Sequence, residues 1–104
     1  MAWCHKRKLV LVGLATVALV FNEALADAKL DKLMANKQYK EAIEHADNNI
    51  PAPSRNADIW VKVGTANLEV GLTEKALACF LVAWRMDADN YNALLGAARV
   101  YNKL

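Results

Sequence analysis

Residues 57–90 decide the fold, and they read ADIWVKVGTANLEVGLTEKALACFLVAWRMDADN. Apolar residues recur at helical spacing on both sides of Gly71, which predicts two amphipathic helices joined by a turn. Gly71 can adopt a positive φ in that turn at little cost, and Gly64 permits close approach of the paired helix. The core of this hairpin is therefore expected to include Leu77, Phe80, Leu81 and Trp84.

The same pattern recurs before and after this stretch at a constant distance of 34 residues. Ala42 corresponds to Ala76, and Trp60 corresponds to Leu94, with no insertion between them. Self-similarity at this period is typical of a solenoid, because one helix pair cannot bury its own apolar face. We therefore expect an all-α fold of antiparallel helix hairpins stacked as a short right-handed solenoid.

The repeat resembles the tetratricopeptide repeat (TPR) family. Residues 27–56 form a degenerate first unit, residues 57–90 a second unit, and residues 91–104 the first helix of a truncated third unit. The resemblance implies a scaffold that binds proteins or peptides. We expect no enzymatic activity and no cofactor, because the sequence contains no arrangement of residues typical of a catalytic or cofactor site. The second unit carries the family pattern at Trp60, Gly64, Ala76, Phe80 and Ala83, whereas Val63, Asn67 and Ala88 replace its usual Leu, Tyr and Pro.

Residues 1–26 have the composition of a secretory signal peptide, which is expected to form a signal helix. A basic cluster ending at Lys8 precedes an apolar run over residues 9–21, and small residues follow at Ala24 and Ala26. Cleavage is expected between Ala26 and Asp27, which would make the protein exported, either periplasmic or secreted. The alternative is an uncleaved membrane anchor over residues 9–21, although a spanning helix needs roughly 20 apolar residues.

The charge of the chain excludes one class of partner. The formal net charge is +2, but removal of residues 1–26 leaves as many acidic as basic residues. A neutral surface with interspersed charges lacks the clustered Lys and Arg of a nucleic-acid-binding protein. We therefore expect no nucleic acid partner, and contact with a membrane only through the signal or anchor segment.

One cysteine and one histidine remain after residue 26. Cys79 can form no internal disulfide and is expected to be a partly buried, inert thiol, consistent with a bacterial periplasm. His45 lies one period earlier, so a Cys-His pair would span neighbouring repeats, commonly about 10 Å apart, whereas nucleophile activation needs about 3 Å. His45 is instead expected to be partly exposed beside Glu41 and Glu44. No spacing typical of a metal site is present.

Polar residues and prolines mark the expected helix ends. Pro51 and Pro53 lack the N–H that a helix needs, so the second helix should end by Ile50. The helices that follow should be capped at their N-termini by Asn56, Thr73 and Asn90.

The resemblance also implies a concave face, built from the first helix of each unit, on which an extended peptide or a partner helix lies. The carboxylate clamp of some relatives is not matched, because Asp27 and Asp31 stand at its first Lys and Asn. The face is expected to consist of Asp31 and Met34 in the first unit, Val61, Thr65, Leu68 and Glu69 in the second, and Asn92 and Leu95 in the third.

Two functions fit these observations. The first is an exported TPR scaffold for protein or peptide binding in the bacterial periplasm or cell envelope. The alternative is an N-terminal structural arm of a larger envelope assembly protein or secreted enzyme. The helix at residues 91–104 has no hairpin partner, so Leu94, Ala97 and Tyr101 should be uncovered on one side. A longer repeat array or another subunit, including a second copy of this chain, would cover them.

Overall fold

The computed structural model describes residues 24–104, and every regular element in that range is helical. The predicted all-α fold is confirmed, whereas the predicted signal helix lies almost wholly outside the described residues. Within residues 24–104, no helix is both long and apolar enough to span a bilayer. The elements are a helix over residues 24–35, α2 (Tyr39–Asn49), the short 3₁₀ helix η1 (Ala52–Ser54), α3 (Ala57–Glu69), α4 (Thr73–Met86) and α5 (Tyr91–Lys103).

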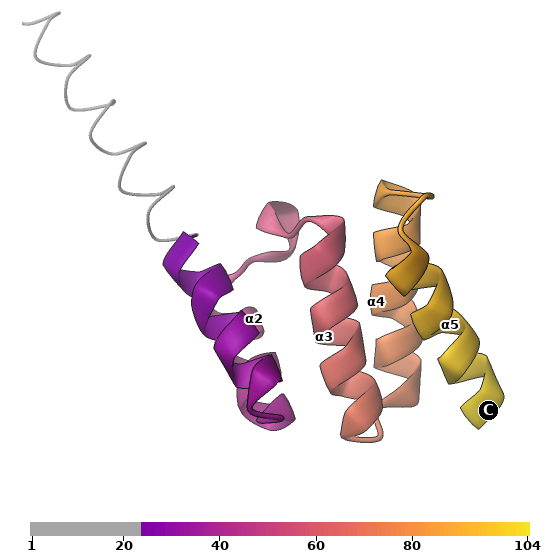
Figure 1. Ribbon diagram of the computed structural model, residues 1–104, viewed down its shortest axis with the longest axis horizontal. Coiled ribbons are helices and arrows are strands. Elements are labelled where there is room, and N and C mark those ends of the chain that lie inside the picture. Colours follow the sequence, from indigo (N-terminus) through magenta and orange to yellow (C-terminus); the bar gives the residue numbers. More distant parts are fainter. Residues whose placement is uncertain (1–23) are drawn as a thin grey trace, which may run out of the picture.

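Successive helices pack against each other in chain order (Figure 1). α2 contacts α3, α3 contacts α4, and α4 contacts α5. α3 also contacts α5, so α4 packs against a pair of helices that touch each other. The segments on the two sides of Gly71 therefore form a helix hairpin, as predicted, while the right-handed superhelix stays a prediction.

The turns within the two hairpins have the same backbone geometry one period apart. Lys37 has a φ of 58°, and Gly71, 34 residues later, has a φ of 88°. The residues that follow them, Gln38 and Leu72, have φ and ψ values of −87° and 68° and of −86° and 69°. The 34-residue period of the sequence is thus matched by a recurrence of the backbone dihedral angles. In the first hairpin, the position with positive φ is occupied by a lysine and not by a glycine.

Asparagine caps begin the first helices of the second and third units. The Asn56 side chain accepts a hydrogen bond from the Ile59 N–H at 2.9 Å, and the Asn90 side chain accepts one from the Ala93 N–H at 3.2 Å. Each bond satisfies a backbone N–H that the helix leaves without an internal partner. Both predicted caps are confirmed.

The predicted cap at Thr73 is wrong. α4 begins at Thr73 itself and has Leu72 at its N-cap position, with no side-chain cap. The Thr73 hydroxyl instead donates toward the Gly71 carbonyl at 3.5 Å. The turn geometry shared with the first hairpin thus sets the helix start, and no side-chain oxygen accepts from the first N–H groups.

The core consists of two clusters of buried residues. The first joins the helix at 24–35 to α2 and α3, and also includes Cys79 of α4. The second joins α3, α4 and α5 around Phe80, whose side chain is 1% exposed. The first cluster comprises Leu30, Ala42, Ala46, Ile50, Ile59, Val63, Ala66 and Cys79, and the second comprises Leu68, Ala76, Phe80, Ala97 and Val100.

The Phe80 ring fills space left by two glycines. A Cβ atom at Gly96 of α5 would lie 2.3 Å from the ring, and one at Gly64 of α3 would lie 3.0 Å from it. The prediction that Gly64 allows close approach is confirmed, and Gly96 of α5 leaves room for the same ring. Phe80 therefore holds α4 against both of its neighbours at once.

Three residues differ from the predicted core and edge. Leu81 and Trp84 are 41% and 44% exposed, because they lie on the side of α4 that contacts neither α3 nor α5, so their assignment to the core was wrong. Ala97 was expected to be uncovered, but it is buried in the second cluster. Leu94 and Tyr101 are exposed, as predicted.

Candidate interaction surface

The residues predicted for a concave face divide into exposed, half-buried and buried groups. The exposed ones are distributed over the helix at residues 24–35, α3 and α5. The first of these helices shares a core cluster and an ion pair with α3, and α3 contacts α5. They are Asp31, Glu69, Asn92 and Leu95; Met34, Val61 and Thr65 are half-buried, and Leu68 is buried.

Leu68 does not belong to an exposed face. Its side chain is 3% exposed and lies in the second core cluster with Ala76 and Phe80 of α4. The prediction for Leu68 was wrong, because this side of α3 is the one that α4 covers. Met34 and Val61 pack against the edges of the first and second clusters, so each offers only part of its side chain to a partner.

An ion pair connects the first helix to α3. The Asp31 carboxylate lies 2.5 Å from the Lys62 ammonium group, and both side chains are partly exposed. An exposed pair of this kind adds at most about 1 kcal/mol of stability. The pair places Asp31, one of the residues predicted for the concave face, beside a basic residue of α3.

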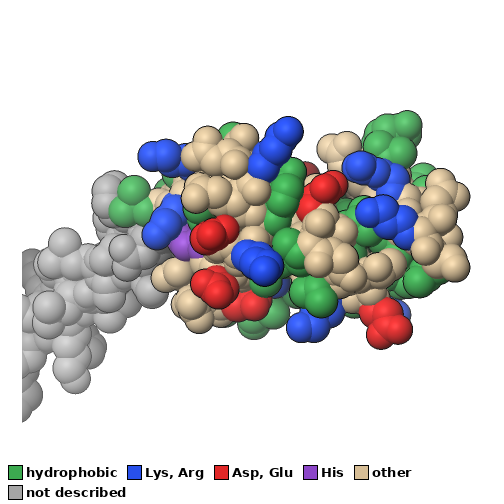
Figure 2. Space-filling model, turned by 90° about the horizontal axis from the view of Figure 1, so that it is seen from below, with side chains coloured by type: hydrophobic (Ala, Val, Ile, Leu, Met, Phe, Trp, Pro, Cys, Tyr) green, Lys and Arg blue, Asp and Glu red, His purple; other side chains and the backbone are tan. Residues whose placement is uncertain are grey.

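Thr65 uses its hydroxyl within the helix. The hydroxyl donates to the Val61 carbonyl at 2.8 Å, so its hydrogen is not free for a ligand. Of the predicted residues, Asp31, Glu69, Asn92 and Leu95 therefore remain the most accessible. Figure 2 shows acidic, basic and hydrophobic side chains interspersed along one face of the molecule.

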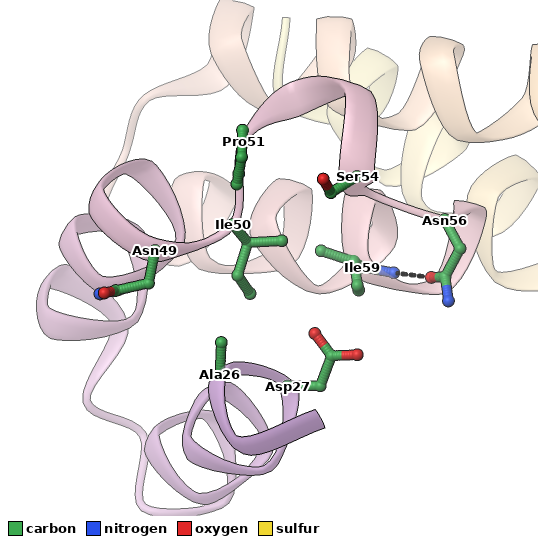
Figure 3. Close-up of a pocket in the computed structure, with 8 residues that line it drawn as sticks. All are labelled: Ala26, Asp27, Asn49, Ile50, Pro51, Ser54, Asn56 and Ile59. Atoms are coloured by element: carbon green, nitrogen blue, oxygen red, sulfur yellow. Dashed lines mark hydrogen bonds between the residues drawn. The ribbon is translucent and has the colours of Figure 1, made fainter. Parts of the chain in front are cut away.

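A small hollow lies between the start of the first helix and the loop after α2. Its volume is about 170 Å³, and Figure 3 shows the Asp27 carboxylate directed into it. A hollow of this size holds a few water molecules at about 30 Å³ each. It is lined by Ala26, Asp27, Asn49, Ile50, Pro51, Ser54, Asn56 and Ile59.

A second depression lies on α4 alone. Leu81, Val82, Trp84 and Arg85 line a volume of about 410 Å³. Because one helix supplies all of its lining, this depression is an open apolar surface and not an enclosed site. It contains the two exposed residues that the sequence had placed in the core.

His45 is buried, not partly exposed as predicted. Its Nε2 lies 2.8 Å from the Ala26 carbonyl oxygen, and its Nδ1 lies 3.1 Å from the side-chain amide of Asn49. This pairing fits a ring that accepts at Nδ1 and donates from Nε2 to the carbonyl. Both ring nitrogens therefore have partners other than Cys79.

Cys79 is a shielded thiol. Burial raises its pKa above the value of 9.0 for a free thiol, while the positive charge of Arg55 opposes and the negative charge of Asp47 reinforces that shift. A raised pKa disfavours the thiolate, which is the reactive form. Together with the partners of His45, this environment argues against the Cys-His pair considered from the sequence.

Arg55 is a buried residue whose role the sequence did not reveal. Its Nε donates to the Ile50 carbonyl at 2.8 Å, its guanidinium group lies 3.4 Å from Asp47, and its charge lies 4.7 Å from the centre of the Trp60 ring. These contacts hold the loop between α2 and α3 against both helices. The sequence could not predict these contacts, because a single Arg in a proline-containing loop belongs to no recurring sequence pattern.

No group of three or more His, Cys, Asp and Glu side chains in residues 24–104 is arranged to hold a metal ion. The remaining buried polar atom of note is the side-chain oxygen of Asn67, which has no hydrogen-bond partner. Its amide nitrogen donates to the Val63 carbonyl at 2.8 Å. The candidate site is therefore a binding surface formed by exposed helix residues.

The comparisons with known proteins point to the same kind of repeat. Superkiller complex protein 3 from Homo sapiens is 31% identical over 68 residues, which is 65% of this chain and 4% of that protein. The Mus musculus protein of the same name is 29% identical over 68 residues, with the same coverage. The chain thus spans a very small part of the length of these relatives. They contain tetratricopeptide repeats, so the similarity supports a TPR-like helical repeat here.

Neither a protein-family profile nor a solved structure matches the chain.

Proposed function

We propose that this chain is an exported scaffold that binds a protein or a peptide in the bacterial periplasm or cell envelope. One observation carries this proposal: exposed side chains lie on each of three first helices that the core holds in succession, at Asp31, Glu69 and Leu95. The similarity to a TPR-containing protein supports protein partners. We propose no catalytic role.

The chemistry of these residues favours a ligand of mixed character. Glu69 offers a carboxylate to a basic residue, Asp31 offers one that already pairs with Lys62, and Leu95 offers apolar area about two-fifths exposed. A peptide that lies across the helices can contact both kinds of group, and its apolar contact would supply the larger part of the affinity.

The exported location is supported by residues 1–26, whose basic cluster, apolar run and small residues have the order of a signal peptide. Retention of residues 9–21 as a membrane anchor is the alternative.

A second candidate function is an N-terminal structural arm of a larger envelope assembly protein or secreted enzyme. The observation that favours it is the coverage of the relatives, because the 68 matching residues make up 4% of their length. Repeats of this kind thus occur as a small part of a much longer chain.

Peptide binding can be tested by selecting ligands from a random peptide library on the purified chain and titrating the best one by calorimetry. We expect saturable binding that the Glu69→Lys and Leu95→Glu variants each weaken at least tenfold. Glu74→Lys, at an exposed position in the first turn of α4, is the matched control and should bind like the wild type. Equal affinity in all variants would place the binding site elsewhere and refute this face.

The location can be tested separately by fractionating bacteria that express the chain and sequencing the N-terminus of the product. A soluble periplasmic product that starts at Asp27 is expected. A product in the membrane fraction that still carries residues 9–21 would support the anchor instead.

A further inference from the structure

The outer side of α4 carries an apolar patch that the equivalent side of α2 lacks. Residues 34 positions apart in these two helices are equivalent, because both helices follow turns of the same backbone geometry. In α2 the outer positions hold exposed polar residues, which are Glu44, Asp47 and Asn48. In α4 the same positions hold apolar residues, which are Ala78, Leu81 and Val82. Ala78 and Leu81 are exposed, and Val82 is half-buried.

The helices that follow α2 do not cover its outer positions. α3 and α4 both come after α2, and the three polar residues nevertheless stay exposed. Helices that follow α4 in the same arrangement would therefore leave its apolar patch open. Trp84 is not part of this patch, because its equivalent, Ile50, is buried in the first cluster with Ile59 of α3.

Opposite charges flank the patch at the two ends of α4. Glu74 lies in the first turn and Arg85 in the last turn. Both side chains are exposed, and neither forms an ion pair within residues 24–104. They share one face of the helix with Ala78 and Leu81, because these four residues follow one another at steps of four, three and four residues.

We propose that the outer face of α4, defined as Glu74, Ala78, Leu81, Val82 and Arg85, binds the same face of a second copy of this chain. The two α4 helices lie antiparallel, and the two-fold axis passes between residues 79 and 80. The proposal goes beyond the peptide-binding function, because none of these five residues belongs to the concave set.

The face is complementary to itself in this arrangement. The axis places Ala78 opposite Leu81 of the second copy, so that a small residue faces a large one, as in the layers of an antiparallel helix pair. It also places Glu74 opposite Arg85 of the second copy, so that a carboxylate faces a guanidinium group. Because the interface is two-fold symmetric, each of these contacts occurs twice.

Other occupants account for less of the face. A helix of an unrelated protein would need only the apolar residues, and nothing would then require Glu74 and Arg85 to lie at equal distances from the centre of the patch. An anionic membrane surface would attract Arg85 but repel Glu74. The second copy uses both charges.

The dimer should be weak, because the interface is short. α4 has 14 residues, and a helix of that length is about 21 Å long at a rise of about 1.5 Å per residue. One pair of such helices buries less surface than the interfaces of stable complexes do. We therefore expect a dimer that dissociates on dilution.

Sedimentation velocity of the purified chain over a hundredfold range of concentration tests the dimer. We expect a monomer at the lowest concentration and a dimer at the highest. Leu81→Lys should stay monomeric throughout, with its helical circular dichroism unchanged. The matched control is Lys40→Glu, at the exposed position of α2 equivalent to Glu74, which should dimerise like the wild type. A monomeric wild type, or a dimer that Leu81→Lys leaves intact, would refute the proposal.

Charge reversal tests the antiparallel register. In the Glu74→Arg variant two cations face each other across the interface, and in the Arg85→Glu variant two anions do. Each variant alone should therefore dimerise about tenfold more weakly. An equal mixture of the two should form a mixed dimer about as tight as the wild-type dimer, because each cation then faces an anion. Single variants that dimerise like the wild type, or a mixture that does not associate, would refute the register.

The dimer and the peptide-binding face can fail separately. Leu81→Lys should bind the selected peptide as the wild type does, because Leu81 is not part of the concave set. Glu69→Lys should dimerise as the wild type does, because it does not alter the outer face of α4. Loss of the dimer in Glu69→Lys would contradict the proposed interface.

Discussion

At the scale of single residues, the buried polar side chains differ in whether their atoms have hydrogen-bond partners. His45 and Arg55 have partners for the polar atoms that they bury, whereas the side-chain oxygen of Asn67 has none. Asn67 also stands where the TPR pattern has a tyrosine. The position is therefore a local weakness that a single substitution can remove.

Replacing Asn67 with Leu should stabilise the fold. The change removes a buried acceptor without a partner, which costs about 1–3 kcal/mol, and gives up one hydrogen bond worth about 1 kcal/mol. We expect the free energy of unfolding in urea to rise by about 1 kcal/mol, and to fall for Asn67→Asp. A loss of stability in Asn67→Leu would mean that a buried water satisfies the oxygen.

The thiol of Cys79 should make stability depend on pH at the alkaline end. Because burial raises its pKa, the folded state holds this proton more tightly than the unfolded state does. Its contribution is fully present below pH 9.0, the unfolded value, and is lost as pH rises through the folded value. Urea titrations at pH 8 and pH 10 should show a smaller alkaline loss for Cys79→Ala than for the wild type. Equal losses would contradict this.

At the scale of helices and turns, the repeat is clearest where backbone geometry is most demanding. The positive φ recurs at Lys37 and Gly71, and the side-chain cap recurs at Asn56 and Asn90. Only Gly71 has the residue that suits its conformation at no steric cost.

Replacing Lys37 with Gly should therefore stabilise the first hairpin. A left-handed conformation destabilises the folded state by about 1–2 kcal/mol for a residue with a Cβ atom, and Gly removes this strain. Gly also gives the unfolded chain more conformational entropy, which offsets part of the stabilisation. We expect about 0.5–1 kcal/mol of added stability in a thermal or urea melt. Lys37→Ala keeps the strained Cβ and serves as the control, with no gain.

The packing of α4 can be tested through its glycines. In the Gly96→Ala variant, the new methyl group would lie 2.3 Å from the Phe80 ring. We expect this overlap to lower the free energy of unfolding by about 1–3 kcal/mol, even though Ala has the better helix propensity. Gly64→Ala, with a contact of 3.0 Å, should cost less. Melting temperatures compare the two, and Phe80→Leu should rescue Gly96→Ala. Equal destabilisation by both substitutions would contradict the expectation that the Phe80 ring packs more tightly against Gly96 than against Gly64.

Helix positions and turns could be predicted from the sequence because they depend on local patterns. Pro51, Asn56 and Gly71 each mark a boundary by their own backbone or side-chain chemistry. The exposure of Leu81 and Trp84 could not be predicted this way, because helical spacing shows which residues share a face but not whether another helix covers that face. For Leu68, the same spacing left open whether α4 or solvent faces the residue.

At the scale of the whole molecule, the two core clusters share α3 and α4. Cys79 of α4 lies in the first cluster, one residue before Phe80 in the second. α3 contributes to both clusters, so neither can be lost without exposing apolar surface of the other. We therefore expect the described chain to unfold as one cooperative unit.

Unfolding should accordingly proceed in a single step. Tryptophan fluorescence, which includes Trp60 at the first cluster, and far-ultraviolet circular dichroism, which averages over all helices, should give coincident transitions in urea. An earlier fluorescence transition would show that the first cluster unfolds by itself.

Under the export proposed above, the hydrogen bond between His45 and the Ala26 carbonyl would also bear on the order of export and folding. That carbonyl belongs to the peptide bond at which signal peptidase is expected to cut, and in the folded chain it lies within a helix and against a buried ring. A protease needs its substrate extended, so a pre-protein that folds in the cytosol would conceal its own processing site. Translocation of the unfolded chain would then have to come first, and folding would follow only after the leader has been released.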